Sequence, residues 1–196
     1  VHQVEGDYQL NGDNDYKKHH LLPIGEFVPF EELLRPIAPF FNLPMSSFAR
    51  GAYQQPNLTA LGYHIAAAIC YEIAFPEQLR DNITPQTDFL LTVSNDAWFG
   101  HSNGPLQHME IAQMRAIEFG RPLVRSTNNG VTAVVDAKGN IIKQLPQFEA
   151  AVLKAKVPLV SGETWFYRFG QWPVLGLSWL LFIFAGIRYW QQTRRR

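Results

Sequence analysis

Cys70, the only cysteine of the chain, is the first candidate for chemistry. It follows the apolar run YHIAAAI and is followed at once by Tyr71 and Glu72. A nucleophile at the turn from a buried strand into a helix is lifted out of the sheet, where substrate and backbone N–H donors can reach it. This setting predicts a thiol nucleophile for acyl transfer or amide chemistry, against the common alternative of a small cysteine that only packs.

A thiolate beside Glu72 needs a nearby cation, because a neighbouring carboxylate raises the pKa of a thiol. Residues 17–20 (KKHH) provide two lysines that could favour the thiolate and stabilise an oxyanion. A histidine of the same segment, or His64, offers the rival Cys–His pairing. We expect no metal site, because no cysteine or carboxylate stands at zinc-like spacing from the paired histidines. His101 and His108 are expected to be surface or packing residues.

Glu26 follows the sequence PIG and directly precedes Phe27. A carboxylate in such a loop can orient a lysine through a charge-assisted hydrogen bond. Spacing alone equally allows an exposed loop acid without a partner.

The elements that must position these residues indicate an α/β domain with a mixed sheet. Apolar runs at 63–70 and 88–94 predict buried strands that end at polar clusters. Short helices are expected at 30–41, where prolines break the pattern, and at 76–82. Near-helical apolar spacing predicts a helix at 105–119 that Gly120 ends. Further strands, joined by the turns TNNG and AKGN, are expected at 123–126, 131–136, 141–142 and 152–157.

Residues 172–190 form a long apolar stretch whose only charge is Arg188. Its length is near the roughly 20 residues that a helix needs to cross the hydrocarbon core, and aromatic residues at both ends suit the two interfaces. Three arginines at 194–196 should stay on the cytoplasmic side, which places the preceding domain on the outer face. The short apolar core at 174–187 also allows a buried C-terminal helix of a soluble protein.

The composition fits a globular domain, with 46% hydrophobic and 17% charged residues. Seventeen basic and seventeen acidic side chains balance, so overall charge gives no indication of a nucleic-acid partner. The N-terminal residues lack the apolar core of a signal peptide, and the chain does not begin with Met. Because an outer-face domain must be exported, we expect the chain to be the C-terminal piece of a longer protein.

Three motifs occur in a specific order: YKKHHLLPIGEF, then AAICYE, then SNDAWFG followed by QHMEIAQMRAIE and RSTNNG. This ordered set resembles the nitrilase superfamily, also called carbon-nitrogen hydrolases, and in particular its apolipoprotein N-acyltransferase branch. The resemblance covers almost the whole chain. It implies a partial nitrilase-like α-β-β-α sandwich at 1–166, followed at 167–196 by one transmembrane helix and a basic cytoplasmic tail.

The resemblance also implies roles for individual residues. Cys70 matches the nucleophile of the family's CYE motif, and Lys18 matches the catalytic lysine of Tyr-x-Lys-x-His-Leu. Glu26 matches the supporting acid of the family's PFGE motif. Tyr71 and Glu72 match the two supporting residues beside the nucleophile that the acyltransferases need. No cofactor and no metal are implied.

The chain departs from the family pattern in two places. Ile24 stands where the family usually has Phe. The family's general-base glutamate lies upstream of the lysine motif, and here only Glu5 precedes Tyr16, too close to Lys18 to take that place. We therefore expect the base and the N-terminal membrane helices to be absent from this chain, and the chain to be inactive alone.

The implied reaction transfers a fatty acyl chain from a membrane phospholipid, through a thioester on Cys70, to the N-terminal amine of a diacylglyceryl-cysteine apolipoprotein. The implied location is the bacterial inner membrane, with the catalytic domain on the periplasmic face. Two alternatives stay open: an amidase or carbamoylase acting on a small substrate, and a non-catalytic membrane-tethered binding domain. The loop at 40–48 (FFNLPMSSF) is expected either to enter the membrane interface, to cover the acyl pocket, or to pack on the domain.

Overall fold

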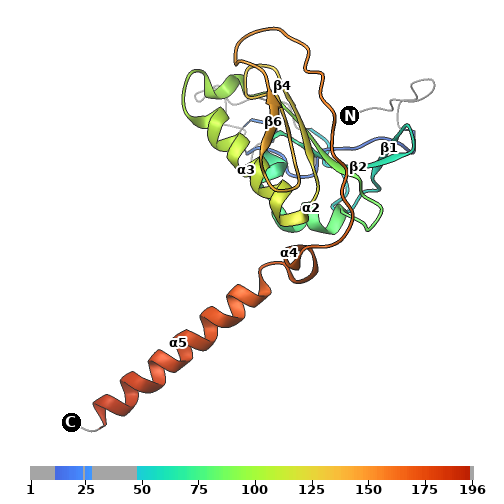
Figure 1. Cartoon of the computed structure of the whole chain (residues 1–196). Helices are drawn as coiled ribbons and strands as arrows, with labels where there is room; N and C mark the ends of the chain where they lie inside the picture. Colours follow the sequence, from blue (N-terminus) through green and yellow to red (C-terminus); the bar gives the residue numbers. More distant parts are fainter. Residues whose placement is uncertain (1–11, 24, 28–47, 195–196) are drawn as a thin grey trace.

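The computed structural model describes residues 12–23, 25–27 and 48–194 (Figure 1). The helix expected at 30–41 and all but the last residue of the loop at 40–48 lie outside these ranges. Glu5, Ile24 and the last two arginines also lie outside them. Predictions on these residues therefore stay predictions.

The described residues form a six-stranded mixed sheet in the order β1-β2-β3-β4-β5-β6. β2, β3 and β4 are parallel to one another, and the outer pairs β1/β2, β4/β5 and β5/β6 are antiparallel. The strands are β1 Leu58–Ala60, β2 Tyr63–Ile69, β3 Phe89–Ser94, β4 Leu123–Thr127, β5 Ala133–Val135 and β6 Ile141–Gln144. The predicted mixed sheet is thus confirmed.

The strand predicted at 152–157 is wrong, because residues 151–161 form no regular structure. Val152 is 81% exposed, and the neighbouring strand β6 is exposed along its whole length. A strand is stabilised by packing on a half-buried face. This segment buries no such face, so its apolar residues are not enough to form a strand.

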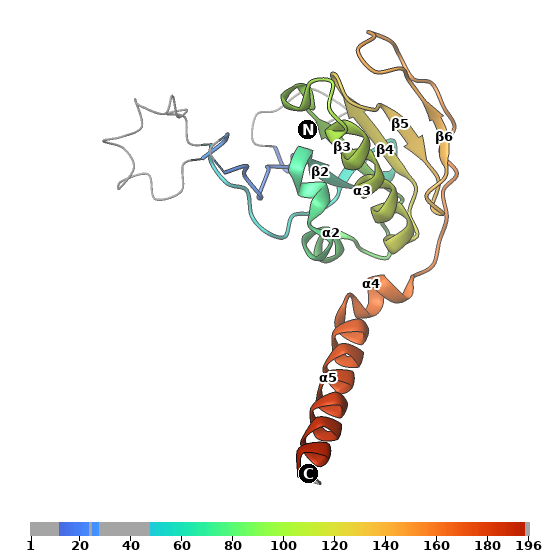
Figure 2. The same cartoon turned by 90° about the vertical axis from the view of Figure 1, so that its left-hand side faces the viewer.

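Two helices cover one face of the sheet (Figure 2). They are α2 Pro76–Asn82 and α3 Gly104–Phe119, both close to their predicted bounds. α3 packs through Ala112 and Ala116, which are fully buried and small enough to let its backbone approach the sheet. Gly120 then ends α3 in the left-handed conformation that favours glycine.

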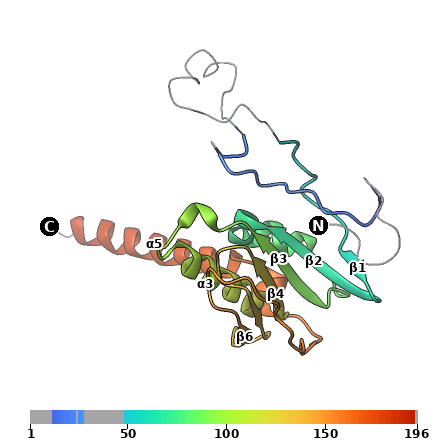
Figure 3. The same cartoon turned by 90° about the horizontal axis from the view of Figure 1, so that it is seen from above.

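The segment at 12–23 runs along the β1 and β2 side of the sheet, as seen from above in Figure 3. Its Tyr16 is buried in a small second core with Leu58 and Ile65. The side chain of Asn14 pairs with both backbone polar groups of Thr59, at 2.8 and 2.9 Å. These contacts fix the lysine segment against the strand that leads to Cys70.

The carboxyl ends of the parallel strands β2, β3 and β4 lie together at one end of the sheet. The C-terminal helices begin near the opposite end, where these strands start. α4 Trp165–Phe169 lies against the last turn of α3, where Thr164 donates a hydrogen bond to the Glu118 carbonyl. α5 Trp172–Thr193 then extends away from the domain (Figure 1). Among the described residues it is the one helix long and apolar enough to cross a membrane, and none of it is buried. A C-terminal helix packed on the domain, the alternative to a spanning helix, is not observed.

Candidate active site

Cys70 is placed at a strained turn directly after β2. It is the first residue of a short 3-10 helix, η2 Cys70–Ala74, and its φ of +54° lies in the left-handed region that non-glycine residues rarely adopt. Its side chain is partly exposed. The predicted strand-to-helix turn is present, and the left-handed residue of this turn is the one that carries the thiol.

Glu72 is buried and saturated with hydrogen-bond donors. Its side chain is 1% exposed, and its Oε1 accepts bonds from the backbone N–H groups of His19 and His20 at 2.6 and 3.1 Å. Its Oε2 accepts from the Tyr16 hydroxyl at 3.0 Å and from the Ile69 N–H at 2.7 Å. Glu72 therefore joins the lysine segment to the end of β2, and its charge is directed at these donors.

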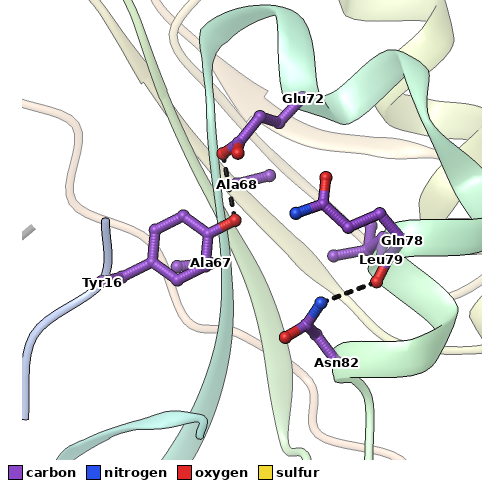
Figure 4. Close-up of a pocket in the computed structure, with 7 residues that line it drawn as sticks. All are labelled: Tyr16, Ala67, Ala68, Glu72, Gln78, Leu79 and Asn82. Atoms are coloured by element: carbon purple, nitrogen blue, oxygen red, sulfur yellow. Dashed lines mark hydrogen bonds between the residues drawn. The ribbon is translucent and has the colours of Figure 1, made fainter. Parts of the chain in front are cut away.

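Tyr16 completes this cluster as a permanent donor. Burial, together with the charge of Glu72, raises the pKa of the Tyr16 phenol well above its ordinary value. A narrow gap, too small to admit a water molecule, lies beside the pair (Figure 4). The Gln78 amide points into it from α2 and has no hydrogen-bond partner among the described residues. The size of the pocket suits a packing gap and not a substrate.

Lys18 is held by Glu26, as the motif predicts. Its Nζ lies 2.7 and 2.6 Å from the two carboxylate oxygens of Glu26, and only 10% of its side chain is exposed. One of these oxygens also accepts a bond from the Leu22 N–H at 2.8 Å. Lys17 is 54% exposed and pairs with Asp15 at 3.4 Å. The two adjacent lysines therefore differ sharply, and only Lys18 is fixed in position.

The histidines considered as partners of Cys70 are engaged elsewhere. His19 Nδ1 lies 2.8 Å from the carbonyl oxygen of Gly51. The ring of His20 stacks on Phe75 with 3.9 Å between centroids, and burial lowers its pKa. His64 lies at the other end of β2. Among the described residues, none of these three histidine rings makes a hydrogen bond to Cys70.

His108 is the histidine that reaches the backbone of Cys70. It is not at the surface; it is buried, as a packing residue would be, but it also makes polar contacts that the expectation did not include. It is 7% exposed on α3, and its Nε2 lies 3.1 Å from the carbonyl oxygen of Cys70. Its Nδ1 lies 3.1 Å from Asp96 Oδ1 and 3.0 Å from Arg125 Nη2. The contact is to the backbone of Cys70 and not to its thiol.

Asp96 and Arg125 form a buried ion pair behind His108. Their nearest atoms are 2.8 Å apart, and both side chains are fully buried. Burial favours the neutral acid, but the contact with His108, the hydrogen bond from Ser94 and the charge of Arg125 outweigh it, so the pKa of Asp96 lies below its ordinary value. Burial lowers the pKa of Arg125, while Asp96 and a thiolate at Cys70 oppose that shift.

These buried residues left weak signals in the sequence. Arg125 is a charged residue inside the apolar strand LVRST, and Asp96 directly follows strand β3 in SNDAWFG. A charge within a buried strand requires a partner of opposite sign. Applied to the sequence, that rule pairs Arg125 with Asp96. No sequence spacing indicates that His108 contacts Cys70.

An open, shallow hollow of about 500 Å³ lies along the carboxyl ends of β2, β3 and β4, and Ile69, the residue before Cys70, contributes to its lining. Its lining includes Ile69, Ser94 and Thr127, each at the end of its strand. Asn128 closes one side, where its Nδ2 donates to Asn95 Oδ1 at 2.6 Å. The hollow is large enough to accept part of a substrate at the end of the strand that leads to Cys70.

Residues 5–167 match the family model described as carbon-nitrogen hydrolase. The chain belongs to the carbon-nitrogen hydrolase family. The expected resemblance is confirmed, and so is the fold class. The sheet and the helices that cover it are the part of the carbon-nitrogen hydrolase sandwich that the described residues contain, and the apolar helix α5 follows the matched domain.

Carbon-nitrogen hydrolase relatives with high identity carry one name. The apolipoprotein N-acyltransferase of Shewanella oneidensis is 72% identical over 190 residues, which are 97% of this chain and 37% of that protein. The protein of the same name from Vibrio cholerae is 60% identical over 194 residues, again 97% of this chain and 37% of that protein. The chain therefore spans a little over a third of the length of these relatives.

Among solved structures, a mutant of the Nesterenkonia AN1 amidase from the nitrilase superfamily superposes with a TM-score of 0.51 and 19% identity. The match covers 84% of this chain and 55% of that chain. At this identity the similarity supports the carbon-nitrogen hydrolase fold alone.

Proposed function

We propose that this chain carries the nucleophile and the lysine of an apolipoprotein N-acyltransferase. The reaction transfers a fatty acyl chain from a membrane phospholipid, through a thioester on Cys70, to the N-terminal amine of diacylglyceryl-cysteine in an apolipoprotein. The observation that carries the proposal is the buried Glu72 cluster, because it ties the Lys18 segment to the strained turn at Cys70. The relatives named above supply the reaction class.

Cys70 acts as the nucleophile in two steps. Its thiolate attacks the ester carbonyl of the phospholipid, the tetrahedral intermediate collapses, and the lysophospholipid alkoxide leaves with a proton. The α-amine of the lipoprotein then attacks the thioester carbonyl and regenerates the thiol. Lys18 stabilises the oxyanion in both steps. Glu26 keeps the Lys18 ammonium fixed through its two short contacts.

Tyr71 and Glu72 support the nucleophile in different ways. Glu72 acts from within the protein, since all four donors that surround it belong to the lysine segment or to the end of β2. Tyr71 is 40% exposed and packs edge-on against Phe75, with 4.9 Å between ring centroids. Its exposed side chain is free to contact a substrate bound at the turn of Cys70.

The proton acceptor for Cys70 belongs to the part of the protein that precedes this chain, as do further membrane helices. The chain is then a C-terminal fragment and is inactive alone. Its span of 37% of the named relatives supports this proposal.

α5 crosses the bacterial inner membrane, with the domain on the periplasmic face and the basic tail in the cytoplasm. Its 22 residues correspond to about 33 Å of helix, close to the roughly 30 Å of the hydrocarbon core. Arg194 lies 3.8 Å from the Trp190 ring centroid, an arrangement suited to the membrane–water interface. Anchoring both substrates and the enzyme in one membrane raises their effective concentration.

A labelling experiment tests the function. The full-length protein, with whatever segment precedes Val1, is reconstituted in vesicles that contain phospholipid with a radiolabelled acyl chain. We expect label on the protein that hydroxylamine removes and that a diacylglyceryl-cysteine peptide discharges. Cys70→Ser should take up no hydroxylamine-sensitive label. Turnover of small amides without any acyl label would instead indicate an amidase, and lipid binding without label would indicate a binding domain.

A further inference from the structure

His108 contacts the backbone carbonyl group of Cys70. A carbonyl oxygen only accepts hydrogen bonds. The His108 Nε2, which lies 3.1 Å from the Cys70 oxygen, is therefore protonated and acts as the hydrogen-bond donor. The opposite nitrogen, Nδ1, lies between Asp96 Oδ1 and Arg125 Nη2. The ring is therefore held at both ends, and its orientation is fixed by a buried ion pair.

The Cys70 carbonyl and the Tyr71 N–H belong to the same peptide group. The described residues contain no cis peptide bond, so the two groups point in opposite directions from one rigid plane. Tyr71 lies in the first turn of η2, where backbone N–H groups have no partner within the helix. A hydrogen bond that fixes the carbonyl also fixes the direction of this free N–H. It also polarises the peptide, which makes the N–H a better donor.

The residues around Asp96 hold His108 in place for its hydrogen bond to the Cys70 carbonyl. Asp96 accepts bonds from Ser94 at 2.6 Å and from Arg125 at 2.8 Å, and a Cβ at Gly130 would lie 2.0 Å from its carboxylate. Burying two opposite charges costs several kcal/mol each before their attraction offsets the loss, and apolar packing of similar volume often serves stability as well or better. An ion pair placed directly behind the turn of the nucleophile is therefore poorly explained by stability alone.

We infer that His108 is a positioning residue: it clamps the Cys70–Tyr71 peptide so that the Tyr71 N–H points at the oxyanion formed when Cys70 attacks a carbonyl. This inference rests on the proposed role of Cys70 as the nucleophile. It concerns any acyl donor, so it holds for a phospholipid ester and for a small activated ester alike.

Two reactions of the same thiol test this role. Attack of Cys70 on p-nitrophenyl butyrate forms an oxyanion, whereas alkylation by iodoacetamide forms none. His108→Leu removes the donor, His108→Gln keeps an N–H donor, and His64→Leu makes the first substitution at the exposed far end of β2. All are measured in the full-length protein, by release of p-nitrophenol in the first turnover, by the alkylation rate, and by thermal unfolding.

We expect His108→Leu to slow acylation by about 10- to 100-fold, somewhat less than the outright loss of an oxyanion donor. Alkylation should change by less than about threefold. His108→Gln should recover part of the acylation rate, and His64→Leu should match the unchanged protein. Equal slowing of both reactions, or acylation that stays at the starting rate in His108→Leu, would overturn the inference. Should the phospholipid fail as donor while p-nitrophenyl butyrate still acylates Cys70, only the proposed function is refuted.

Discussion

Replacing Glu72 by Gln tests whether this buried carboxylate joins the lysine segment to β2. In the native structure both oxygens of Glu72 face only donors: two backbone N–H groups at Oε1, and the Tyr16 hydroxyl with the Ile69 N–H at Oε2. A glutamine amide has one acceptor oxygen and one NH₂ group. The Tyr16 hydroxyl can turn to accept from the NH₂, but at least one backbone N–H then loses its acceptor.

The expected magnitude follows from these contacts. A hydrogen bond to a charged group contributes about 1.5–3 kcal/mol, and a buried donor left unpaired costs about 1–3 kcal/mol. With one bond lost and the others weakened, we expect Glu72→Gln to lower the free energy of unfolding by about 3 kcal/mol. At about 2–4 °C per kcal/mol for a domain of this size, Tm should fall by about 6–12 °C.

The assay is thermal unfolding in detergent, followed by near-ultraviolet circular dichroism. Glu149→Gln is the matched control, because Glu149 is exposed and the same change at a surface position should alter stability by no more than about 0.5 kcal/mol. If Glu72→Gln melts within about 2 °C of Glu149→Gln, the carboxylate does not hold the two segments together.

Three further predictions concern individual side chains. Lys18→Met should reduce thioester formation on Cys70 by at least about 10²-fold, whereas the neighbouring Lys17→Met should leave it unchanged; equal losses would contradict the different environments of the two lysines. The pKa of Asp96 is lower in the folded state, so its contribution to stability is fully present above the unfolded pKa of about 3.9 and is lost as the pH falls through the folded pKa. Tm should therefore fall more steeply below about pH 4 than in Asp96→Asn, and parallel curves would refute this. Gly130→Ala would place a Cβ 2.0 Å from the Asp96 carboxylate, so we expect a loss of about 1–3 kcal/mol in urea unfolding, and none if the loop simply shifts.

The parts of the site that the sequence could predict are those expressed in local patterns. The apolar run before Cys70 predicts a buried strand and a turn, and the spacing at 105–119 predicts α3, because both depend on neighbours along the chain. The pairing of Lys18 with Glu26 spans eight residues within one motif. The same reasoning failed at 152–157, where apolar residues occur but no face of the domain buries them.

The remaining features depend on contacts between segments far apart in the sequence. No sequence pattern near Glu72 reveals its hydrogen-bond partners. Two of them are the backbone N–H groups of His19 and His20, which lie 53 and 52 residues earlier and have no sequence signature. From its position in the sequence alone, Glu72 is expected to raise the pKa of the Cys70 thiol. His108 likewise acts on a backbone carbonyl 38 residues away, and no residue type marks a carbonyl as an acceptor. Contacts of this kind become visible only when the sheet order is known.

The direction of the parallel strands determines where α5, the proposed membrane anchor, is attached relative to the thiol of Cys70. Cys70 follows the carboxyl end of β2, while α4 contacts the end of α3 and thus lies where the strands begin. The seven residues of β2 separate these two ends by about 20 Å. With α5 in the bilayer as proposed, one helix fixes the height of its own attachment point and leaves the far end of the domain free to swing. Because β2 separates the thiol from this attachment point, a small tilt of the domain about the start of α5 moves the thiol several ångströms nearer to the bilayer surface or farther from it.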